Sequence, residues 1–582
     1  MTLALASAAP AAQAGDSAAP IERGRPALPG QRVRNVLLLV ADDLGVDKVG
    51  IYGAADAPPT PNLDRLARDG VLFRNAWAQP TCSPSRALIQ TGRLGFRTTI
   101  GQVVSTFSGG PALPLSELTL PEMLDLGKGG RFAHALIGKW HLGSSQVGGA
   151  FAPNLAGYQH FAGTLEGQLP SYTSWDRVVD GISTRVTGYA TSVVVDDALA
   201  WIQAQDRPWM CTVSFQAPHA PFHRPPAHLH TRALPPQDPR PSCGAPGADP
   251  QPFFDAMVEA LDTEIGRLLS GLPDRERTAV IFLGDNGTDR CVSSTPLHAK
   301  SSLYEGGVHV PMLVSGAGVA RAGESTALVS AADVFATVAE LVGVDLAAAF
   351  PGTAFDSVSL APYLSDPGRP SQRRWLYAET FTPNGPGNPR PLPPCPAAPV
   401  CQTDLGFGGP GDAHLSVCGR PLYGMYGSNS VPIRLEGALP GAAVTLFIGG
   451  FAPAPNPTVG GWLVSNPPSA AHAFHADATG VVDVSIWTAD TSPELHYQCV
   501  VENPAMPGGF EVSNAVRIEP LWTDMQALRG VRYKLIRFDP CREELYDLTL
   551  DPEEQHDLLR GPLTTPQQQA LDALRHGLEL AR

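Results

Sequence analysis

Four runs of hydrophobic residues in the first half of the chain each end in polar or charged side chains. The runs cover residues 35–40, 134–137, 211–215 and 278–283. Continuous apolar runs of this length are typical of strands buried on both faces of a parallel sheet. Amphipathic patterns that predict helices lie between them, over residues 61–69, 192–205 and 253–272. The alternation predicts an α/β fold with a doubly wound, mostly parallel sheet, whose strand ends gather polar residues at one edge.

The pattern changes after residue 382, where Pro, Gly and Asn become frequent. Short runs of alternating hydrophobic and polar residues follow, with Gly-rich turns between them, at 431–435, 443–448 and 481–486. Such runs predict an antiparallel β-sandwich. Beyond residue 518 the earlier pattern returns, and residues 567–580 predict a closing helix. The β-sandwich is therefore predicted to be inserted into a larger unit rather than appended to it.

These changes predict five segments in a chain of 582 residues, which is long enough for one large domain and smaller ones. They are a leader and linker at 1–32, a main α/β domain at 33–370, a smaller C-terminal α+β subdomain made of 371–382 and 519–582, a Pro/Gly-rich linker at 383–412, and an inserted all-β module at 413–518. The module resembles, in composition only, β-sandwich units of secreted bacterial proteins.

Charge and leader sequence narrow the choice of partners and location. The formal net charge is −15 at pH 7, which argues against nucleic acid as a partner. No later run is long and apolar enough to predict a transmembrane span. Residues 3–15 are similar to the end of a signal peptide with an A-x-A cleavage site, although a basic start and a long apolar core are missing. We expect a protein that is secreted or periplasmic.

Eight cysteines remain once Cys82 is set aside, and an even number in a Pro/Gly-rich chain predicts disulfides. They are Cys211, Cys243, Cys291, Cys395, Cys401, Cys418, Cys499 and Cys541. Cys418 and Cys499, near the two ends of the β-module, are candidates for one bridge. The alternative is a set of scattered reduced thiols. None of the eight has the paired spacing of a zinc site.

Cys82 stands in the stretch Cys-Ser-Pro-Ser-Arg, which ends at Arg86 and is followed by Thr-Gly-Arg at 91–93. Pro84 suits the first turn of a helix, and Ser83 is a plausible N-cap. Cys82 would then lie at a helix N-terminus, where an anion is favoured. A lone free cysteine is more often a small buried hydrophobe.

This stretch resembles the C-x-P-x-R signature of type I sulfatases, which belong to the alkaline-phosphatase superfamily. The resemblance covers roughly residues 33–382 and 519–580 and implies an alkaline-phosphatase-like fold. It also implies that a formylglycine-generating enzyme oxidises Cys82 to formylglycine. One hydroxyl of the hydrated aldehyde attacks the sulfur of a sulfate ester, and the second then loses its proton so that sulfate is eliminated. A serine lacks that second hydroxyl.

Paired polar residues at two strand ends point to a metal. Asp42 and Asp43 follow the first run, where the turn at 44–45 lets neighbouring carboxylates share an ion, and Asp285 and Asn286 follow a later run. An all-oxygen set suits a hard cation. Taken alone, an Asp-Asp pair is more often a helix cap. The resemblance implies Ca²⁺, with Mg²⁺ as the alternative, in a metal site made of these four residues together with Cys82.

Basic residues in three further motifs complete the family's set. Lys139 and His141 lie in Gly-Lys-Trp-His, His219 lies in Pro-His-Ala-Pro, and Lys300 begins Lys-x-x-x-Tyr-Glu-Gly-Gly. The resemblance implies that Lys139 and Lys300 contact the sulfate, that His141 is the base for elimination, and that His219 protonates the leaving alcohol. Arg86 would hold the formylglycine and brace the metal carboxylates. Each motif alone is equally well explained by a surface loop or a turn histidine.

The chain departs from the family pattern at three places. His309 stands where an arginine is usual, and residues 333–337 read Asp-Val-Phe-Ala-Thr in place of D-x-x-P-T. A serine that contacts sulfate in some members is either Ser171 or Ser174, because no motif fixes it. We expect the change at His309 to affect local packing more than chemistry.

The predicted function is hydrolysis of a sulfate monoester, either an aryl sulfate or a carbohydrate sulfate. Because the net charge repels a sulfated substrate, the site must concentrate positive charge locally. Two alternatives remain at this point. One is a phosphonate or phosphate monoester hydrolase of the same superfamily, and the other is an inactive protein that binds a sulfated polymer.

Overall fold

The computed structural model describes residues 33–581, with several internal gaps. The residues left out within that range are 107–108, 243–245, 383, 388–402, 407–410, 417–421, 424–427, 450–453, 457–460, 464–469, 490–494, 507, 519–524 and 540–541. The predicted leader therefore lies outside the described residues, as do Cys243, Cys395, Cys401, Cys418 and Cys541.

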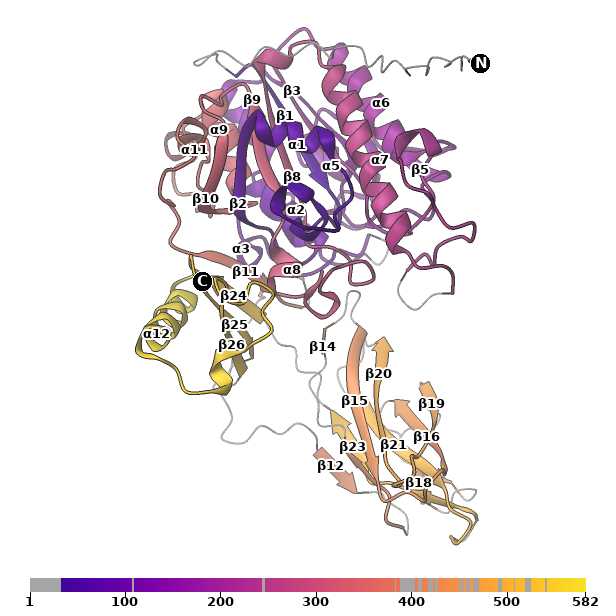
Figure 1. Cartoon of the computed structure of the whole chain (residues 1–582). Coiled ribbons are helices and arrows are strands. Elements are labelled where there is room, and N and C mark those ends of the chain that lie inside the picture. Colours follow the sequence, from indigo (N-terminus) through magenta and orange to yellow (C-terminus); the bar gives the residue numbers. More distant parts are fainter. Residues whose placement is uncertain are drawn as a thin grey trace, which may run out of the picture.

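A ten-stranded sheet dominates the first part of the chain (Figure 1). Its order is β10-β2-β9-β8-β1-β7-β3-β4-β5-β6. The strands are β1 (Asn35–Ala41), β2 (Gly70–Trp77), β3 (Ala133–Lys139), β4 (His160–Thr164), β5 (Trp175–Val179), β6 (Ile182–Val186), β7 (Trp209–Ser214), β8 (Thr278–Gly284), β9 (Met312–Gly316) and β10 (Gly323–Ser330). Strands β8, β1, β7, β3 and β4 run parallel, which confirms the predicted α/β class.

Antiparallel neighbours flank this parallel centre. Strand β9 is antiparallel to both β8 and β2, and β5 is antiparallel to β4 and β6. All four apolar runs predicted as strands lie in the centre, as β1, β3, β7 and β8. The four are buried along their whole length, as expected for strands covered on both faces.

Two hydrophobic cores lie on opposite faces of the sheet. Alternate residues of β1 divide between them, with Val36 and Leu38 in one core and Leu37 and Leu39 in the other. The first core includes side chains from α2 (Cys82–Thr91), α4 (Leu120–Lys128), α9 (Asp333–Val342) and α11 (Ala361–Ser365). The second includes α1 (Pro61–Arg68), α6 (Ala190–Gln203) and α7 (Gln251–Ser270). The sheet is thus doubly wound, and α1, α6 and α7 match the predicted helices to within two residues.

The last part of the chain forms smaller antiparallel sheets. Strand β11 (Leu376–Thr380) pairs with β24 (Met525–Arg529), which continues into β25 (Tyr533–Asp539) and β26 (Arg542–Asp547). Helix α12 (Thr565–Leu580) begins two residues before its predicted start. The remaining helices are short: α3 (Gly95–Thr98), α5 (Ala152–Leu155), α8 (Glu305–Val308) and α10 (Leu346–Ala349).

Between β11 and β24 the chain builds two facing sheets, of order β12-β23-β21-β16-β19 and β13-β15-β14 with β20 beside β15. The strands are β12 (Thr403–Gly406), β13 (His414–Ser416), β14 (Leu422–Tyr423), β15 (Ser428–Glu436), β16 (Ala443–Gly449), β17 (Ala454–Asn456), β18 (Gly461–Leu463), β19 (Ala470–His475), β20 (Val482–Ala489), β21 (Leu495–Glu502), β22 (Phe510–Val512) and β23 (Ala515–Ile518). Apolar side chains of both sheets form one core, which confirms an inserted all-β module. The exact domain limits stay a prediction.

The cysteines correct one expectation. Cys211 and Cys499 are free and buried, so the proposed bridge between Cys418 and Cys499 is wrong. Each lies in an apolar core, where a thiol packs as a small hydrophobic group. Cys291 is disulfide-bonded. Among the described residues, none of the helices combines the length and apolar character that a bilayer crossing requires.

Candidate active site

Two adjacent strand ends bring four oxygen-bearing side chains together. Ala41 and Gly284 end the parallel neighbours β1 and β8 in register, so Asp42 and Asp43 emerge beside Asp285. Backbone bonds fix the pair: Asp285 N–H donates to the Ala41 carbonyl at 2.9 Å, and Asp43 N–H donates to Asp285 Oδ1 at 3.2 Å. All three carboxylates are fully buried.

The turn after β1 allows both carboxylates to face one point. Asp43 has a left-handed backbone with φ of 64°, a conformation that aspartate tolerates better than most residues. Gly45 follows, and its N–H donates to Thr288 Oγ1 at 3.1 Å. A Cβ at Gly45 would lie 2.9 Å from that same hydroxyl, so only glycine fits. The predicted turn is thus present, with its left-handed residue at Asp43.

Three buried oxygens in this corner fit a bound cation. Asp42 Oδ1, Asp43 Oδ2 and Asn286 Oδ1 have no hydrogen-bond partner among the described residues. Asn286 directs its amide nitrogen at Asp43 Oδ1, at 2.8 Å, which leaves its own oxygen available. Buried lone pairs without a donor are costly unless a cation satisfies them. Carboxylate and amide oxygens are the ligands that Ca²⁺ and Mg²⁺ prefer.

A cysteine and a histidine lie at the same corner. Donor atoms of Asp42, Asp43, Cys82 and His219 all lie within 4.8 Å of one another. Asp285 braces the corner, since it accepts from Asp43 N–H on one oxygen and from Arg86 on the other. We call the ten residues of this region the active-site cluster: Asp42, Asp43, Cys82, Arg86, Lys139, His141, His219, Asp285, Asn286 and Lys300.

Three buried cations face the three carboxylates. Lys139 pairs with Asp42, Lys300 pairs with Asp43, and Arg86 Nη2 lies 2.7 Å from Asp285 Oδ2. Burial alone would raise the pKa of Asp42, but Lys139 and the other nearby cations outweigh it and hold that pKa below its usual range. The three cations therefore balance the three carboxylates, within a protein of negative net charge.

Cys82 is the first residue of α2 and is only 2% exposed. Its sulfur lies 3.5 Å from Lys300 Nζ. Burial raises the pKa of the thiol to about 11, even though Lys139 and Lys300 act in the opposite direction. An unmodified Cys82 is therefore a neutral thiol at neutral pH and not a reactive thiolate.

The N-cap of α2 corrects the sequence prediction. Thr81, with an extended backbone, occupies the cap position, and Ser83 is the second residue of the helix. The Ser83 hydroxyl has another task, because it donates to the His141 carbonyl at 2.9 Å and accepts from Val104 N–H at 3.0 Å. The prediction failed because the helix starts at Cys82 itself. Ser83 thus joins three segments beneath the cluster.

His141 follows strand β3 with a left-handed backbone, φ 57°. Its Nε2 lies 3.2 Å from the Val104 carbonyl, which can only accept, so Nε2 carries the proton. Nδ1 is then the basic nitrogen, and it has no hydrogen-bond partner within the part of the chain that the structure describes. Burial, with Lys139 and Arg86 nearby, holds the pKa of His141 well below its usual value. The imidazole is therefore neutral and able to accept a proton.

His219 has the opposite tautomer. Its Nδ1 donates to the Ala220 carbonyl at 2.6 Å, and its Nε2 lies 3.8 Å from Asp43 Oδ2. Burial lowers the pKa of His219, while Asp43 acts to raise it. Nε2 is thus the nitrogen that faces the carboxylate corner.

Lys300 is held between two segments of the cluster. Its N–H donates to the Thr288 carbonyl at 3.0 Å, and the next residue, Ser301, donates to the Pro80 carbonyl at 2.8 Å. Gly287 and Gly307 allow these loops to touch, since a Cβ on Gly287 would lie 1.8 Å from the carbonyl oxygen of Gly306. Gly287 and Gly307 therefore serve close backbone packing.

A family model described as Sulfatase matches residues 34–344, which is more than half of the chain. The chain belongs to the sulfatase family. N-acetylgalactosamine-6-sulfatase of Sus scrofa is 30% identical to this sulfatase over 386 residues, covering 59% of this chain and 68% of its own. Arylsulfatase A of Homo sapiens is 30% identical over 391 residues, covering 60% and 71%. The protein is therefore a sulfuric ester hydrolase.

Solved structures support the fold of this sulfatase. Ps i-CgsB in complex with k-i-k-neocarrahexaose superposes with a TM-score of 0.58 and 18% identity, covering 94% of this chain and 92% of that one. BT4656 in complex with its substrate D-glucosamine-2-N,6-O-disulfate gives a TM-score of 0.56 and 17% identity, covering 94% and 97%. At these identities the likeness establishes architecture alone.

The sulfatase brings together every residue predicted for its site. The six predicted catalytic residues and the four oxygen ligands all belong to the active-site cluster, while their individual roles stay predictions. Ser171 contacts Thr173, and Ser174 accepts from Arg185; the structure describes no contact of either serine with the cluster. One participant was missed: Ser214, which ends β7, hydrogen-bonds Arg86 and donates to the Lys139 carbonyl. Its place at a strand end was the available signal.

One departure from the family pattern, His309, has a structural explanation. His309 Nε2 donates to the Arg74 carbonyl at 2.8 Å, and its Nδ1 lies 3.3 Å from Glu305. Asp333 starts α9, where it accepts from Ser330 N–H and pairs with Arg373. His309 thus holds a backbone segment in place, as expected for a change that affects packing. Asp333 matches the family pattern, and the departure in its segment is Ala336 in place of proline.

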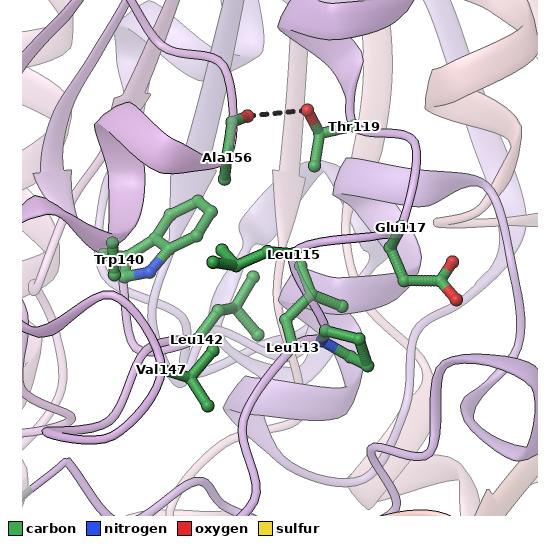
Figure 2. Close-up of a pocket in the computed structure, with 10 residues that line it drawn as sticks. Leu113, Leu115, Glu117, Thr119, Trp140, Leu142, Val147 and Ala156 are labelled. Atoms are coloured by element: carbon green, nitrogen blue, oxygen red, sulfur yellow. Dashed lines mark hydrogen bonds between the residues drawn. The ribbon is translucent and has the colours of Figure 1, made fainter.

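A separate apolar pocket lies beside the Gly-Lys-Trp-His motif (Figure 2). Trp140 lines it together with Leu113, Leu142 and Val147, and the Thr119 hydroxyl donates to the Ala156 carbonyl at its rim. Trp140 therefore anchors its segment in apolar packing, while its neighbours Lys139 and His141 belong to the cluster. Nothing in this pocket duplicates the charged chemistry of the active-site cluster.

Proposed function

We propose that this sulfatase hydrolyses aryl or carbohydrate sulfate monoesters with a formylglycine formed from Cys82 and a bound divalent cation, Ca²⁺ or Mg²⁺. The observation that carries the proposal is the meeting of Cys82 with Asp42 and Asp43, whose free oxygens lie in the same corner. A thiol in a purely apolar setting would have argued against it.

Asp42, Asp43, Asp285 and Asn286 are the residues that would hold the cation. Bound there, it would supply positive charge against the non-bridging sulfate oxygens. The structural observation that favours a cation is that one oxygen each of Asp42, Asp43 and Asn286 has no hydrogen-bond donor among the described residues. Arg86 keeps one oxygen of Asp285 occupied and so fixes the orientation of that carboxylate.

The formylglycine, once hydrated, supplies one hydroxyl to attack sulfur and a second whose deprotonation releases sulfate. Lys139 and Lys300 hold the sulfate and balance its charge. His141 accepts a proton at Nδ1, the nitrogen that its bond to Val104 leaves free. His219 presents Nε2 to the leaving alcohol, because its Nδ1 is engaged by Ala220, and it donates a proton there when the imidazole is protonated on both nitrogens.

Maturation and location complete the proposal. Cys82 is buried, so a formylglycine-generating enzyme must reach it before α2 packs against the sheet. The signal-peptide-like start at residues 3–15 favours export, to the periplasm or the medium. The substrate would be a sulfated small molecule or a polysaccharide.

The test uses the full chain produced together with a formylglycine-generating enzyme. Intact-mass analysis must show that Cys82 has become an aldehyde, and rates are then compared on para-nitrophenyl sulfate, phosphate and phenylphosphonate. We expect the sulfate ester to be turned over fastest. Faster phosphonate or phosphate turnover would assign the site to the other hydrolase class. Binding of a sulfated polymer without turnover of any ester would favour the non-catalytic alternative.

A further inference from the structure

Tyr172 lies in the loop between β4 and β5, outside every motif of the sequence. Its side chain is buried, and its hydroxyl lies 2.8 Å from the Gln216 carbonyl and 2.7 Å from the His219 carbonyl. Both oxygens can only accept, so the hydroxyl is the donor to this pair. A single O–H group therefore spans the two ends of the turn that carries His219.

That turn is closed by His219 N–H, which donates to the Gln216 carbonyl at 2.9 Å. On the side of the metal carboxylates, Asp42 N–H donates to the Ala217 carbonyl at 3.2 Å. On the opposite side of the turn, the Tyr172 hydroxyl donates to the Gln216 and His219 carbonyls. The turn is thus held between the strand end that bears Asp42 and the tyrosine hydroxyl.

The position of the imidazole depends on this backbone. His219 Nδ1 bonds to the carbonyl of the very next residue, Ala220, so the ring cannot rotate without breaking a 2.6 Å bond. Nε2 then points wherever the backbone at 219–220 directs it. An error in that backbone would move Nε2 away from the position of the leaving oxygen.

Tyr172 is itself well fixed. Its carbonyl accepts from Ala190 N–H, at the first residue of α6, at 2.8 Å. Its ring stacks on His223, with centroids 4.1 Å apart. Tyr189 lies in the same aromatic group, but its hydroxyl lies 3.4 Å from His223 Nε2 and no contact with the 216–219 turn is among those described.

We propose that Tyr172 is a positioning residue, whose hydroxyl holds the 216–219 turn so that His219 Nε2 meets the leaving oxygen. The proposal rests on the proposed function, because it needs His219 to act on the leaving group. It predicts a defect that depends on the leaving group. Esters of weakly acidic alcohols need the proton from His219 most, whereas esters of acidic phenols scarcely need it.

The experiment compares Tyr172→Phe with the matched control Tyr189→Phe in formylglycine-containing enzyme. Values of kcat/KM are measured for aryl sulfates whose phenols span a wide range of acidity. For Tyr172→Phe we expect a loss of about tenfold on the poorest leaving group and less than about twofold on the best, since small misplacements of a catalytic group have effects of this size. For Tyr189→Phe the dependence on leaving group should match the wild type.

A double-mutant test isolates the role. In a His219→Ala background, Tyr172→Phe should produce little further change in the leaving-group dependence, because the group it positions is gone. A purely structural role would lower the rate on all esters equally and would persist in that background, and either result would overturn the proposal. A ring-fluorinated tyrosine at position 172 keeps a hydroxyl that donates more strongly, so it covers the case in which Tyr172→Phe does not fold. A steeper dependence in that variant would also overturn the proposal.

The experiments distinguish a failure of the proposed function from a failure of the positioning role of Tyr172. If wild-type enzyme with a confirmed aldehyde turns over no sulfate ester, the proposed function fails and the role of Tyr172 falls with it. If the wild type is active and the leaving-group dependence of Tyr172→Phe is unchanged, only the positioning role fails.

Discussion

Two buried clusters, each containing both cations and carboxylates, meet in one segment of the chain. They differ in how many of their carboxylate oxygens accept a hydrogen bond. Lys300 belongs to the active-site cluster, in which Asp42, Asp43 and Asn286 each keep an oxygen without a donor among the residues that the structure describes. Five residues later, Glu305 has a donor on each of its oxygens, from Lys534 on one and Arg529 on the other. The first arrangement leaves lone pairs for a ligand, whereas the second uses them within the protein.

We call the second group the Glu305 cluster: Glu305, His309, Arg529, Lys534 and Glu554. Lys534 is fully buried, contacts both glutamates and lies 4.7 Å from the ring centroid of Trp77. Glu554 accepts from Glu305 N–H. The cluster therefore joins α8, directly after Lys300, to the C-terminal sheet. The comparison teaches that burial and charge alone do not mark a catalytic site; the active-site cluster differs in that the oxygens left without a donor lie together beside Cys82.

The largest expected effect is at Cys82. Cys82→Ser and Cys82→Ala should each lower kcat by more than about 1,000-fold, the scale seen when a nucleophile is removed. Neither change should alter the thermal unfolding midpoint by much, since the residue keeps its place in α2. Activity of purified variants is compared with wild type of confirmed aldehyde content. Substantial turnover by either variant would contradict the assignment of Cys82 as nucleophile.

Lys534→Met tests whether the Glu305 cluster stabilises the fold rather than takes part in catalysis. It leaves Glu305 and Glu554 buried without their shared cation, which costs about 3–5 kcal/mol of unfolding free energy. The measurement is denaturant unfolding, with kcat determined on the folded fraction. We expect stability to fall far more than the rate per folded molecule, and the reverse would show that the Glu305 cluster is catalytic.

Calcium should distinguish the two clusters by stabilisation. Addition of Ca²⁺ to chelator-treated protein should stabilise it by about 2.7 kcal/mol when the ion is at about 100 times its Kd. The increase in the thermal midpoint should disappear in Asp43→Asn and persist in Lys534→Met. Equal responses of wild type and Asp43→Asn would argue against the metal site.

The smallest effect is a pH dependence at the Glu305 cluster. Burial raises the pKa of Glu554 from 4.5 to about 7, against the opposing effect of Lys534. The group therefore adds stability that is fully present below pH 4.5 and is lost as the pH rises through about 7. The stability of wild type relative to Glu554→Gln should fall across this range in urea unfolding at low salt. A constant or rising difference would contradict the raised pKa.

Much of this architecture follows from local patterns in the sequence. The four apolar runs became the parallel strands β1, β3, β7 and β8, because strands covered on both faces must be apolar throughout. Parallel strands also end at the same edge of a sheet, so the polar residues that follow them lie close together. This part of the active-site cluster was therefore predictable. The antiparallel placement of β9 was not, since a run of apolar residues carries no direction.

Other features depend on contacts that leave no local trace. Tyr172 donates its hydrogen bonds to backbone carbonyl groups. Every residue has such a group, so no sequence motif marks the partners of Tyr172. Cys499 was expected in a bridge because cysteines were counted, but its thiol packs in the core of the β-module. Ser83 fitted the preferences for a helix cap, yet the helix begins at Cys82, two residues before the start that a cap at Ser83 predicts.

The pairing of β11 with β24 has a consequence for biosynthesis. The whole β-module lies between these two strands, so a ribosome must complete it before the four-stranded sheet can close. The contact in which Glu554 accepts from Glu305 N–H, next to the Lys300 segment, forms later still. During translation, the segment bearing Cys82 thus emerges long before the last tertiary contacts exist, and the oxidation proposed for its thiol would have to take place in that interval.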